Sequence, residues 1–208
     1  MIFDKYIYKV IDNYLNNLDE CIFDSAGDNE IEILKNSVYR KRMPYLLERE
    51  HLARIDESDL ADRSHLLSLK LRGRLIATCR LTPTPFEINK LFSETENTLA
   101  RYENYMEISR LVCLKNSMTP VFLIHAGNKA FHKMRRGGFV GLCTKQYIGA
   151  FEKFGLKVVY GPKVIEERRG KEYFIVAASY TTMGLRAWGY IFMDKVKNIF
   201  FRNTASKH

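Results

Sequence analysis

The stretch Met106-Glu107-Ile108-Ser109-Arg110-Leu111-Val112 is apolar and β-prone, and it carries a carboxylate and a guanidinium three residues apart. Along a regular strand, side chains at i and i+3 point to opposite faces of the sheet. If Glu107 and Arg110 serve one site, the strand must therefore contain a β-bulge, because one extra residue restores a common face. The alternative is an ordinary core strand whose two charges lie at its rim.

A bulge in this strand would also leave a main-chain N–H without a partner in the sheet. A carboxylate can take a proton from an amine, and a main-chain N–H can stabilise an oxyanion. Together with an arginine in one cleft, these groups suit acyl transfer to an amine.

Length and composition restrict the possible classes of protein. The 208 residues predict a single domain over 1–208, with a basic and aromatic C-terminal segment from about 184 to 208. Hydrophobic residues make up 46% of the chain, which is enough for a sizeable core. The net charge of +9 predicts an electropositive surface, which suits nucleic acid, an anionic membrane or an acidic protein partner.

The cysteines and histidines do not predict a metal site. The four cysteines have no CxxC spacing and mostly lie in apolar runs, so we expect buried thiols in a reducing compartment. His125 and His132 are seven residues apart, and no third ligand is evident. No apolar run approaches the roughly 20 residues that span a bilayer, and the N-terminus does not resemble a secretory signal. These features predict a soluble cytoplasmic protein.

Hydrophobic periodicity and turn signals predict the order of the elements. Helices are expected over 5–20, 30–50 (divided by Pro44), 88–101, 121–134 and 139–154. Strands are expected over 65–71 and 74–81 as a hairpin turning at Arg72-Gly73, over 106–112, over 157–160 ended by Gly161-Pro162, and over 172–180 as a buried central strand. This order predicts an α+β domain with a mixed, mostly antiparallel sheet flanked by helices.

The two faces of the second hairpin strand are expected to differ, because one carries core residues and the other carries a possible site residue. Its core face is expected to carry Leu75, Ala77, Cys79 and Leu81. Arg80 lies on the other face with Ile76 and Thr78, and an arginine there is seldom buried without an acid.

Three further groups of charged residues each allow two interpretations. Asp59-Leu60-Ala61-Asp62 suits a cation, an ammonium group or the orientation of arginines, or it is a solvated loop. Arg40-Lys41-Arg42 is either a solvated helix surface or the source of an arginine reaching into a cleft. Arg135-Arg136-Gly137-Gly138, placed before the helix expected from 139, suits a phosphate or is only a turn.

Three motifs follow one another along the chain: Asp59-x-x-Asp62, Cys79-Arg80-Leu81-Thr82-Pro83-Thr84 and Glu107-Ile108-Ser109-Arg110. In order, spacing and residue type they resemble the acyl-homoserine-lactone synthases and the related N-acyl amino acid synthases, which share the GNAT acyltransferase fold. The resemblance covers residues 38–160. It implies a GNAT-like fold and transfer of a fatty acyl group from acyl carrier protein to the α-amine of an amino acid. It implies no tightly bound cofactor, because the donor is the acyl-phosphopantetheine of the carrier protein.

The resemblance also implies roles for individual residues. The catalytic group comprises Glu107, Ser109 and Arg110. The acceptor-binding or structural network comprises Arg42 (with Arg40 as an alternative), Asp59, Asp62 and Arg80. The residues expected near the acyl donor are Leu111, Val112, Arg135, Arg136 and Gly138. Glu107 is the expected base, directly or through a water, and Arg80 or Arg110 is expected to hold the carboxylate of the acceptor.

Two departures from the family pattern refine this expectation. The GNAT pyrophosphate loop ends in a second small residue where this chain has Val140, which argues against coenzyme A. The lactone synthases carry a tryptophan shortly after the arginine of their second helix, whereas the only tryptophan here is Trp188. This favours the N-acyl amino acid synthases, with tyrosine as one acceptor of a described branch. A homoserine-lactone synthase using S-adenosylmethionine and acyl carrier protein is the alternative enzyme.

Two non-enzymatic classes are weaker alternatives. A nucleic-acid-binding module would suit the positive charge, but the sequence has no helix-turn-helix, zinc or aromatic RNA-binding signature, so we expect no nucleic acid partner. The basic and aromatic segment from 184 either packs on its own domain or makes a weak contact with a membrane surface, and the second alternative would suit a peripheral membrane protein.

Overall fold

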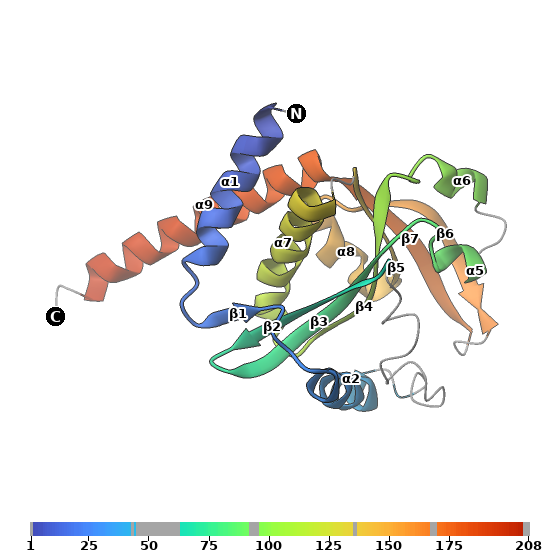
Figure 1. The fold of residues 1–208 in the computed structure, drawn as a ribbon, viewed down its shortest axis with the longest axis horizontal. Coiled ribbons are helices and arrows are strands. Elements are labelled where there is room, and N and C mark those ends of the chain that lie inside the picture. Colours follow the sequence, from blue (N-terminus) through green and yellow to red (C-terminus); the bar gives the residue numbers. More distant parts are fainter. Residues whose placement is uncertain are drawn as a thin grey trace.

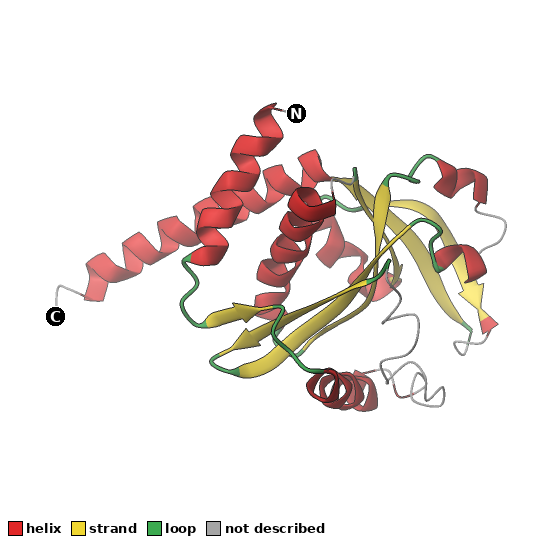
Figure 2. Ribbon diagram, viewed as in Figure 1, coloured by secondary structure: helices red, strands yellow, loops and turns green. Residues whose placement is uncertain are grey.

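The structure is a computed structural model and describes residues 2–42, 44, 63–91, 96–134, 137–166 and 170–205. Seven strands form one sheet in the order β1-β2-β3-β4-β5-β7-β6 (Figures 1 and 2). All neighbouring strands are antiparallel except β4 and β5, which are parallel. The predicted α+β fold with a mixed, mostly antiparallel sheet is confirmed.

The strands are β1 (Cys21–Phe23), β2 (His65–Leu71), β3 (Arg74–Pro83), β4 (Tyr105–Cys113), β5 (Gly138–Thr144), β6 (Lys157–Ile165) and β7 (Lys171–Ser179). The described helices are α1 (Ile2–Asn16), α2 (Asp28–Arg42), α5 (Ile88–Leu91), α6 (Glu96–Ala100), α7 (Thr119–Lys129), α8 (Lys145–Lys153) and α9 (Tyr180–Ala205). A 3-10 turn, η3 (Asn116–Met118), precedes α7, and a π-helical turn, η4 (Ala130–Met134), follows it.

Helices cover both faces of the sheet (Figure 1). On one face, α1, α7, α8 and α9 pack with strand side chains such as Leu69 and Cys79 in the main core. On the other face, α2 packs against Val112 near β3 and β4. On that same face α5 and α6 pack further along the sheet, against Val140 and Ile175.

The hairpin formed by β2 and β3 is confirmed, and its turn explains its register. Arg72 and Gly73 have φ angles of +52° and +76°, which is the left-handed pair that a two-residue hairpin turn requires. A bulge follows in β3: Leu69 pairs with Ala77 but Lys70 pairs with Leu75, so the residue between, Ile76, is extra.

This bulge changes the predicted core face of β3. Ala77, Cys79 and Leu81 pack in the main core as expected. Leu75 does not, because the bulge turns it towards α2, and Ile76 takes its place in the main core.

Three predicted elements differ from the observed ones. The expected helix 139–154 is divided into β5 and α8, because a short apolar run buried on both faces has no periodicity that separates a strand from a helix. The strand expected to stop at Gly161-Pro162 continues to Ile165, and a register shift between Tyr160 and Lys163 accommodates these residues. Within the helix expected over 88–101, the structure describes the short helices α5 and α6, and residues 92–95 between them lie outside the described residues.

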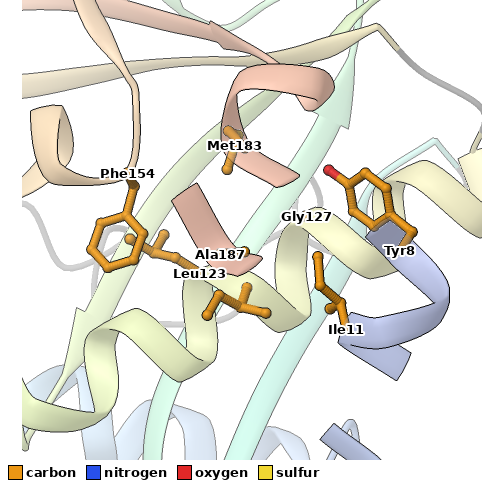
Figure 3. A pocket seen from close by; sticks show the side chains of 8 residues that line it. Tyr8, Ile11, Leu123, Gly127, Phe154, Met183 and Ala187 are labelled. Atoms are coloured by element: carbon orange, nitrogen blue, oxygen red, sulfur yellow. The ribbon is translucent and has the colours of Figure 1, made fainter. Parts of the chain in front are cut away.

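A small apolar cavity lies between α1, α7 and α9 (Figure 3). Tyr8 borders it from α1, Gly127 from α7 and Met183 from α9. It lies within the main core, on the face of the sheet opposite to α2.

Candidate functional site

The β-bulge predicted in the central strand is present. Arg110 and Leu111 of β4 together lie opposite Cys79 of β3. The pairs on either side of them are Arg80 with Ser109 and Thr78 with Val112. Arg110 has a φ of +53°, a left-handed conformation that residues other than glycine seldom adopt.

The bulge begins at Arg110 and does not fall between Glu107 and Arg110. Glu107 and Ser109 share a face by regular alternation, and the residue that the bulge returns to that face is Val112. Arg110 occupies the bulge position itself, with a half-buried side chain. The predicted bulge therefore exists, but it brings Val112, and not Arg110, to the face that carries Glu107 and Ser109.

The carboxylate of Glu107 is buried at the start of α5. The side chain is only 3% exposed, and Oε2 accepts the main-chain N–H groups of Glu87 at 2.5 Å and Ile88 at 3.3 Å. Burial raises the pKa of Glu107 to about 7, and the nearby carboxylate of Glu87 adds to the rise. The two N–H bonds and the charge of Arg80 act in the opposite direction without offsetting it. A carboxyl group of this kind exchanges a proton near neutral pH.

Arg80 is completely buried beside this carboxylate. Its Nε donates to Oγ of Ser109 at 3.2 Å, and its Nη2 forms an ion pair with the carboxylate of Glu87. A buried arginine needs such an acid, as the sequence indicated. The side chain of Glu87 thus binds Arg80, while its main chain binds Glu107.

Sequence reasoning missed Glu87. The available signal was the requirement that a buried Arg80 be paired with an acid, but no spacing rule chose Glu87 among the acids of the chain. The choice depends on the chain turning back after β3, which brings residue 87 over the end of that strand.

The two parallel strands separate next to Glu107. As described in the structure, the pairing of β4 with β5 runs from Tyr105 opposite Gly138 to Ile108 opposite Gly141, and there it stops. A Cβ on Gly141 would lie 3.0 Å from Cγ2 of Ile108, so glycine permits the close approach at this last pair. Beyond it, β4 continues to Cys113 and β5 to Thr144. Strands that separate in this way can present main-chain groups to an extended ligand.

Arg42 reaches the far end of β4, where Nη1 donates to the carbonyl oxygen of Cys113 at 3.0 Å. Arg40, the alternative, is exposed. Leu111 packs against the main core, and Val112 is buried beneath α2.

Of the four residues predicted to suit a phosphate, the structure describes only the two glycines. Gly138 is the first residue of β5, at the end of the β4–β5 pair opposite to the separation. A Cβ there would clash with the carbonyl oxygen of Ala178, so packing explains this glycine. The helix N-terminus on which the phosphate prediction rested is absent at residue 139, because a strand lies there. Arg135 and Arg136 lie outside the described residues, as do Asp59 and Asp62.

The two histidines have separate partners. His125 Nε2 lies 3.1 Å from Oδ1 of Asp24, and His132 Nε2 lies 2.9 Å from Oδ2 of Asp12. Among the described residues, no group of three or more His, Cys, Asp or Glu side chains is placed to hold a metal ion.

No protein-family model matches the sequence, and no curated protein matches it. Solved structures do resemble it. FeeM, an N-acyl amino acid synthase from uncultured soil microbes, has a TM-score of 0.59 at 10% identity, covering 77% of this chain and 91% of FeeM. The acyl-homoserine-lactone synthase LasI has a TM-score of 0.58 at 13% identity, covering 81% of this chain and 95% of LasI.

BjaI, a coenzyme A-dependent acyl-homoserine-lactone synthase solved with S-adenosylmethionine and isopentyl-CoA, has a TM-score of 0.57 at 13% identity. That match covers 76% of this chain and 79% of BjaI. These likenesses establish the fold, which is the GNAT-like acyltransferase fold.

Proposed function

We propose that this chain is an N-acyltransferase that moves a fatty acyl group from acyl carrier protein to the α-amine of an amino acid, with tyrosine as a candidate acceptor. The observation that carries the proposal is the position of Glu107. It is a buried acid whose pKa is raised to about 7, and it lies beside the last residue pair before β4 and β5 separate. The fold shared with an N-acyl amino acid synthase is consistent with this function.

Glu107 acts as the general base in this proposal. The α-amine of a free amino acid is largely protonated at neutral pH, so it loses one proton to solvent before it attacks and a second proton when the amide forms. A carboxylate with a pKa near neutrality is suited to accept that proton, directly or through a water. The amine nitrogen bonds to the thioester carbonyl carbon as Glu107 takes this second proton, the carbon–sulfur bond breaks, and the leaving thiolate of phosphopantetheine receives the proton from Glu107.

The bulge supplies the second element of the mechanism. The thioester carbonyl would lie against β4 at residues 109–111, where a main-chain N–H stabilises the developing oxyanion. The acyl-pantetheine chain would enter between β4 and β5 beyond Ile108 and Gly141. No step forms a covalent intermediate with the protein, so no cysteine has to be a nucleophile.

Arg110 is the better candidate for the acceptor carboxylate. Arg80 is completely buried, and its guanidinium is bound to Ser109 and to Glu87. We therefore assign Arg80, with Arg42 at the other end of β4, to holding the site in place. Arg110 is half-buried at the bulge position, off the face that carries Glu107, and its greater exposure is the reason for preferring it to Arg80.

Carrier protein is the proposed donor because of charge. The net charge of +9 suits docking of an acidic partner, and carrier proteins are typically acidic. Because BjaI, which this chain resembles in fold, is coenzyme A-dependent, acyl-CoA is the alternative donor against which carrier protein should be compared.

The test is to supply the purified chain with a C12 to C16 acyl carrier protein and each of the common amino acids, and to weigh the products by mass spectrometry. An N-acyl amino acid formed with one acceptor, and lost in Glu107→Gln, supports the proposal. A parallel reaction with S-adenosylmethionine tests the lactone synthase alternative. An acyl-homoserine lactone as the sole product would overturn the choice of acceptor, and acyl-CoA working better than the carrier protein would overturn the donor.

A further inference from the structure

The outer face of α9 carries large apolar side chains in solvent. Leu185, Trp188 and Phe192 are 46%, 48% and 55% exposed, and their spacing of i, i+3 and i+7 places them on one side of the helix. The rings of Trp188 and Phe192 stack with their centroids 5.9 Å apart. Met193 extends this patch and is also exposed. We call these four residues the α9 patch.

The opposite face of α9 holds the helix on the domain. Met183, Ala187 and Ile191 are buried in the main core. A Cβ on Gly184 would lie 3.0 Å from Cγ2 of Ile7, so α1 and α9 pack closely there. The α9 patch therefore cannot turn inward without breaking this packing, and the C-terminal half of the helix runs out past the rest of the molecule (Figure 1).

The sequence around the patch is basic. Residues 184–208 contain five bases, Arg186, Lys195, Lys197, Arg202 and Lys207, and the single acid Asp194. That acid is engaged on the inner side of the helix, where Oδ2 accepts the hydroxyl of Tyr14 at 3.3 Å. The segment thus combines exposed aromatic side chains with a net charge of +4, that is, five bases less one acid.

We propose that the α9 patch binds the surface of an anionic lipid bilayer, with the helix lying in the plane of the membrane. Aromatic and aliphatic side chains on one face of a helix enter the boundary between headgroups and acyl chains, and nearby lysines and arginines are attracted to anionic lipids. A second copy of the chain suits the patch less well, because two chains of +9 repel each other. The proposal is independent of acyl transfer.

None of the described helices is both long enough and apolar enough to cross a bilayer.

Trp188 makes the experiment simple because it is the only tryptophan in the chain. Its fluorescence is measured for the full-length protein with phosphatidylglycerol vesicles and with pure phosphatidylcholine vesicles, alongside sedimentation of the same mixtures. We expect a blue shift and sedimentation with the anionic vesicles, both reduced by added salt. The double variant Leu185→Ser with Phe192→Ser keeps the reporter and is expected to weaken binding about 10-fold or more.

The matched control is Ile33→Ser on α2, which removes an apolar side chain that is 63% exposed elsewhere on the surface. It is expected to bind vesicles as the unchanged protein does, and circular dichroism checks that every variant is folded. The proposal is overturned if anionic vesicles neither shift the emission nor sediment the protein, or if both kinds of vesicle act equally. It is also overturned if the shift occurs without vesicles and grows with protein concentration, because a second copy then covers the patch.

Discussion

Glu107 and Glu87 are joined by a 2.5 Å hydrogen bond from the main-chain N–H of Glu87 to Oε2 of Glu107, while the side chain of Glu87 binds Arg80. One residue therefore positions the candidate base and neutralises the buried arginine beside it. Because Arg80 also binds Ser109, the position of the base is coupled to the strand residue that precedes the bulge.

Replacing the proposed base should slow the reaction. Glu107→Gln keeps the size and the two accepted N–H bonds but cannot take a proton, so we expect turnover to fall by about 10²-fold or more. In the unchanged enzyme, kcat/KM should rise with pH through about 7, because Glu107 must be ionised to act. Steady-state assays from pH 5.5 to 9 measure both effects. Equal turnover of the two proteins would remove Glu107 from the mechanism.

The same carboxyl group should make stability depend on pH. Its pKa is raised in the folded state from 4.5 to about 7, so the folded protein binds the proton more tightly than the unfolded chain. The free energy of unfolding therefore falls as pH rises from about 4.5 to 7. Glu107→Gln cannot ionise, so its stability relative to the unchanged protein should increase over this interval. Urea unfolding at pH 5 and pH 8 tests this, and a pH-independent difference would contradict it.

Asp24 should have the opposite dependence. Burial alone would raise its pKa, but the hydrogen bonds and charges of His125 and Lys129 outweigh this and lower the pKa to about 2. The stability it contributes is present above 3.8, its ordinary value, and is lost as pH falls towards 2. Asp24→Asn suits the φ of +54° and should cost about 2 kcal/mol at pH 7.

The measurement for Asp24 is the urea unfolding of both proteins from pH 7 down to the lowest pH at which they stay folded. The difference between them should shrink as the carboxylate of the unchanged protein becomes protonated. A constant difference would mean that the geometry of Asp24, and not its charge, stabilises the fold.

Removing the side chain of Arg110 should weaken binding of the acceptor carboxylate. Arg110→Gly retains a residue that accepts the φ of +53°, so the bulge should survive. We expect KM for the amino acid to rise about 10-fold or more with a smaller change in kcat, and no change for the corresponding amine without a carboxylate. Arg80→Lys is the comparison, and it should lower stability without this selectivity. An equal loss with both acceptors would contradict the assignment.

Gly127 should tolerate a methyl group in the cavity between α1, α7 and α9. A Cβ there would meet only Cε of Met183, at 3.7 Å, which is an ordinary contact. Glycine inside a helix costs about 1 kcal/mol relative to alanine, so Gly127→Ala should raise the free energy of unfolding by about that amount. Gly184→Ala is the control and should gain less, because its Cβ would crowd Ile7 at 3.0 Å.

Local signals in the sequence predicted much of the fold. The hairpin followed from two apolar runs around Arg72-Gly73. A bulge is present in β4, but it does not bring Glu107 and Arg110 to one face, which was the reason for predicting it. The predictions failed where the local sequence pattern does not distinguish a strand from a helix. Residues 138–144 are buried on both faces by neighbouring strands and helices, so their run of apolar residues fits a helix equally well.

The sequence predicted which residues belong to the candidate site better than it predicted which of them contact one another. The motifs around Arg80 and Glu107 are adjacent through the pairing of β3 with β4, and Ser109 binds Arg80. The pairing of Arg80 with Glu87 depends on tertiary structure and has no signature in either motif. Likewise, Ile76 replaces Leu75 in the main core because of a bulge in β3. This bulge is visible only in the pairing of β3 with β2.

The short parallel pairing of β4 with β5 has a mechanical consequence. In the described sheet, only the four residue pairs from Tyr105–Gly138 to Ile108–Gly141 join the half made of β1 to β4 to the half made of β5, β7 and β6. An extended ligand inserted between β4 and β5 beyond Ile108 and Gly141 would break no hydrogen bond of this pair, because the pairing has already ended there, and it would displace only side chains.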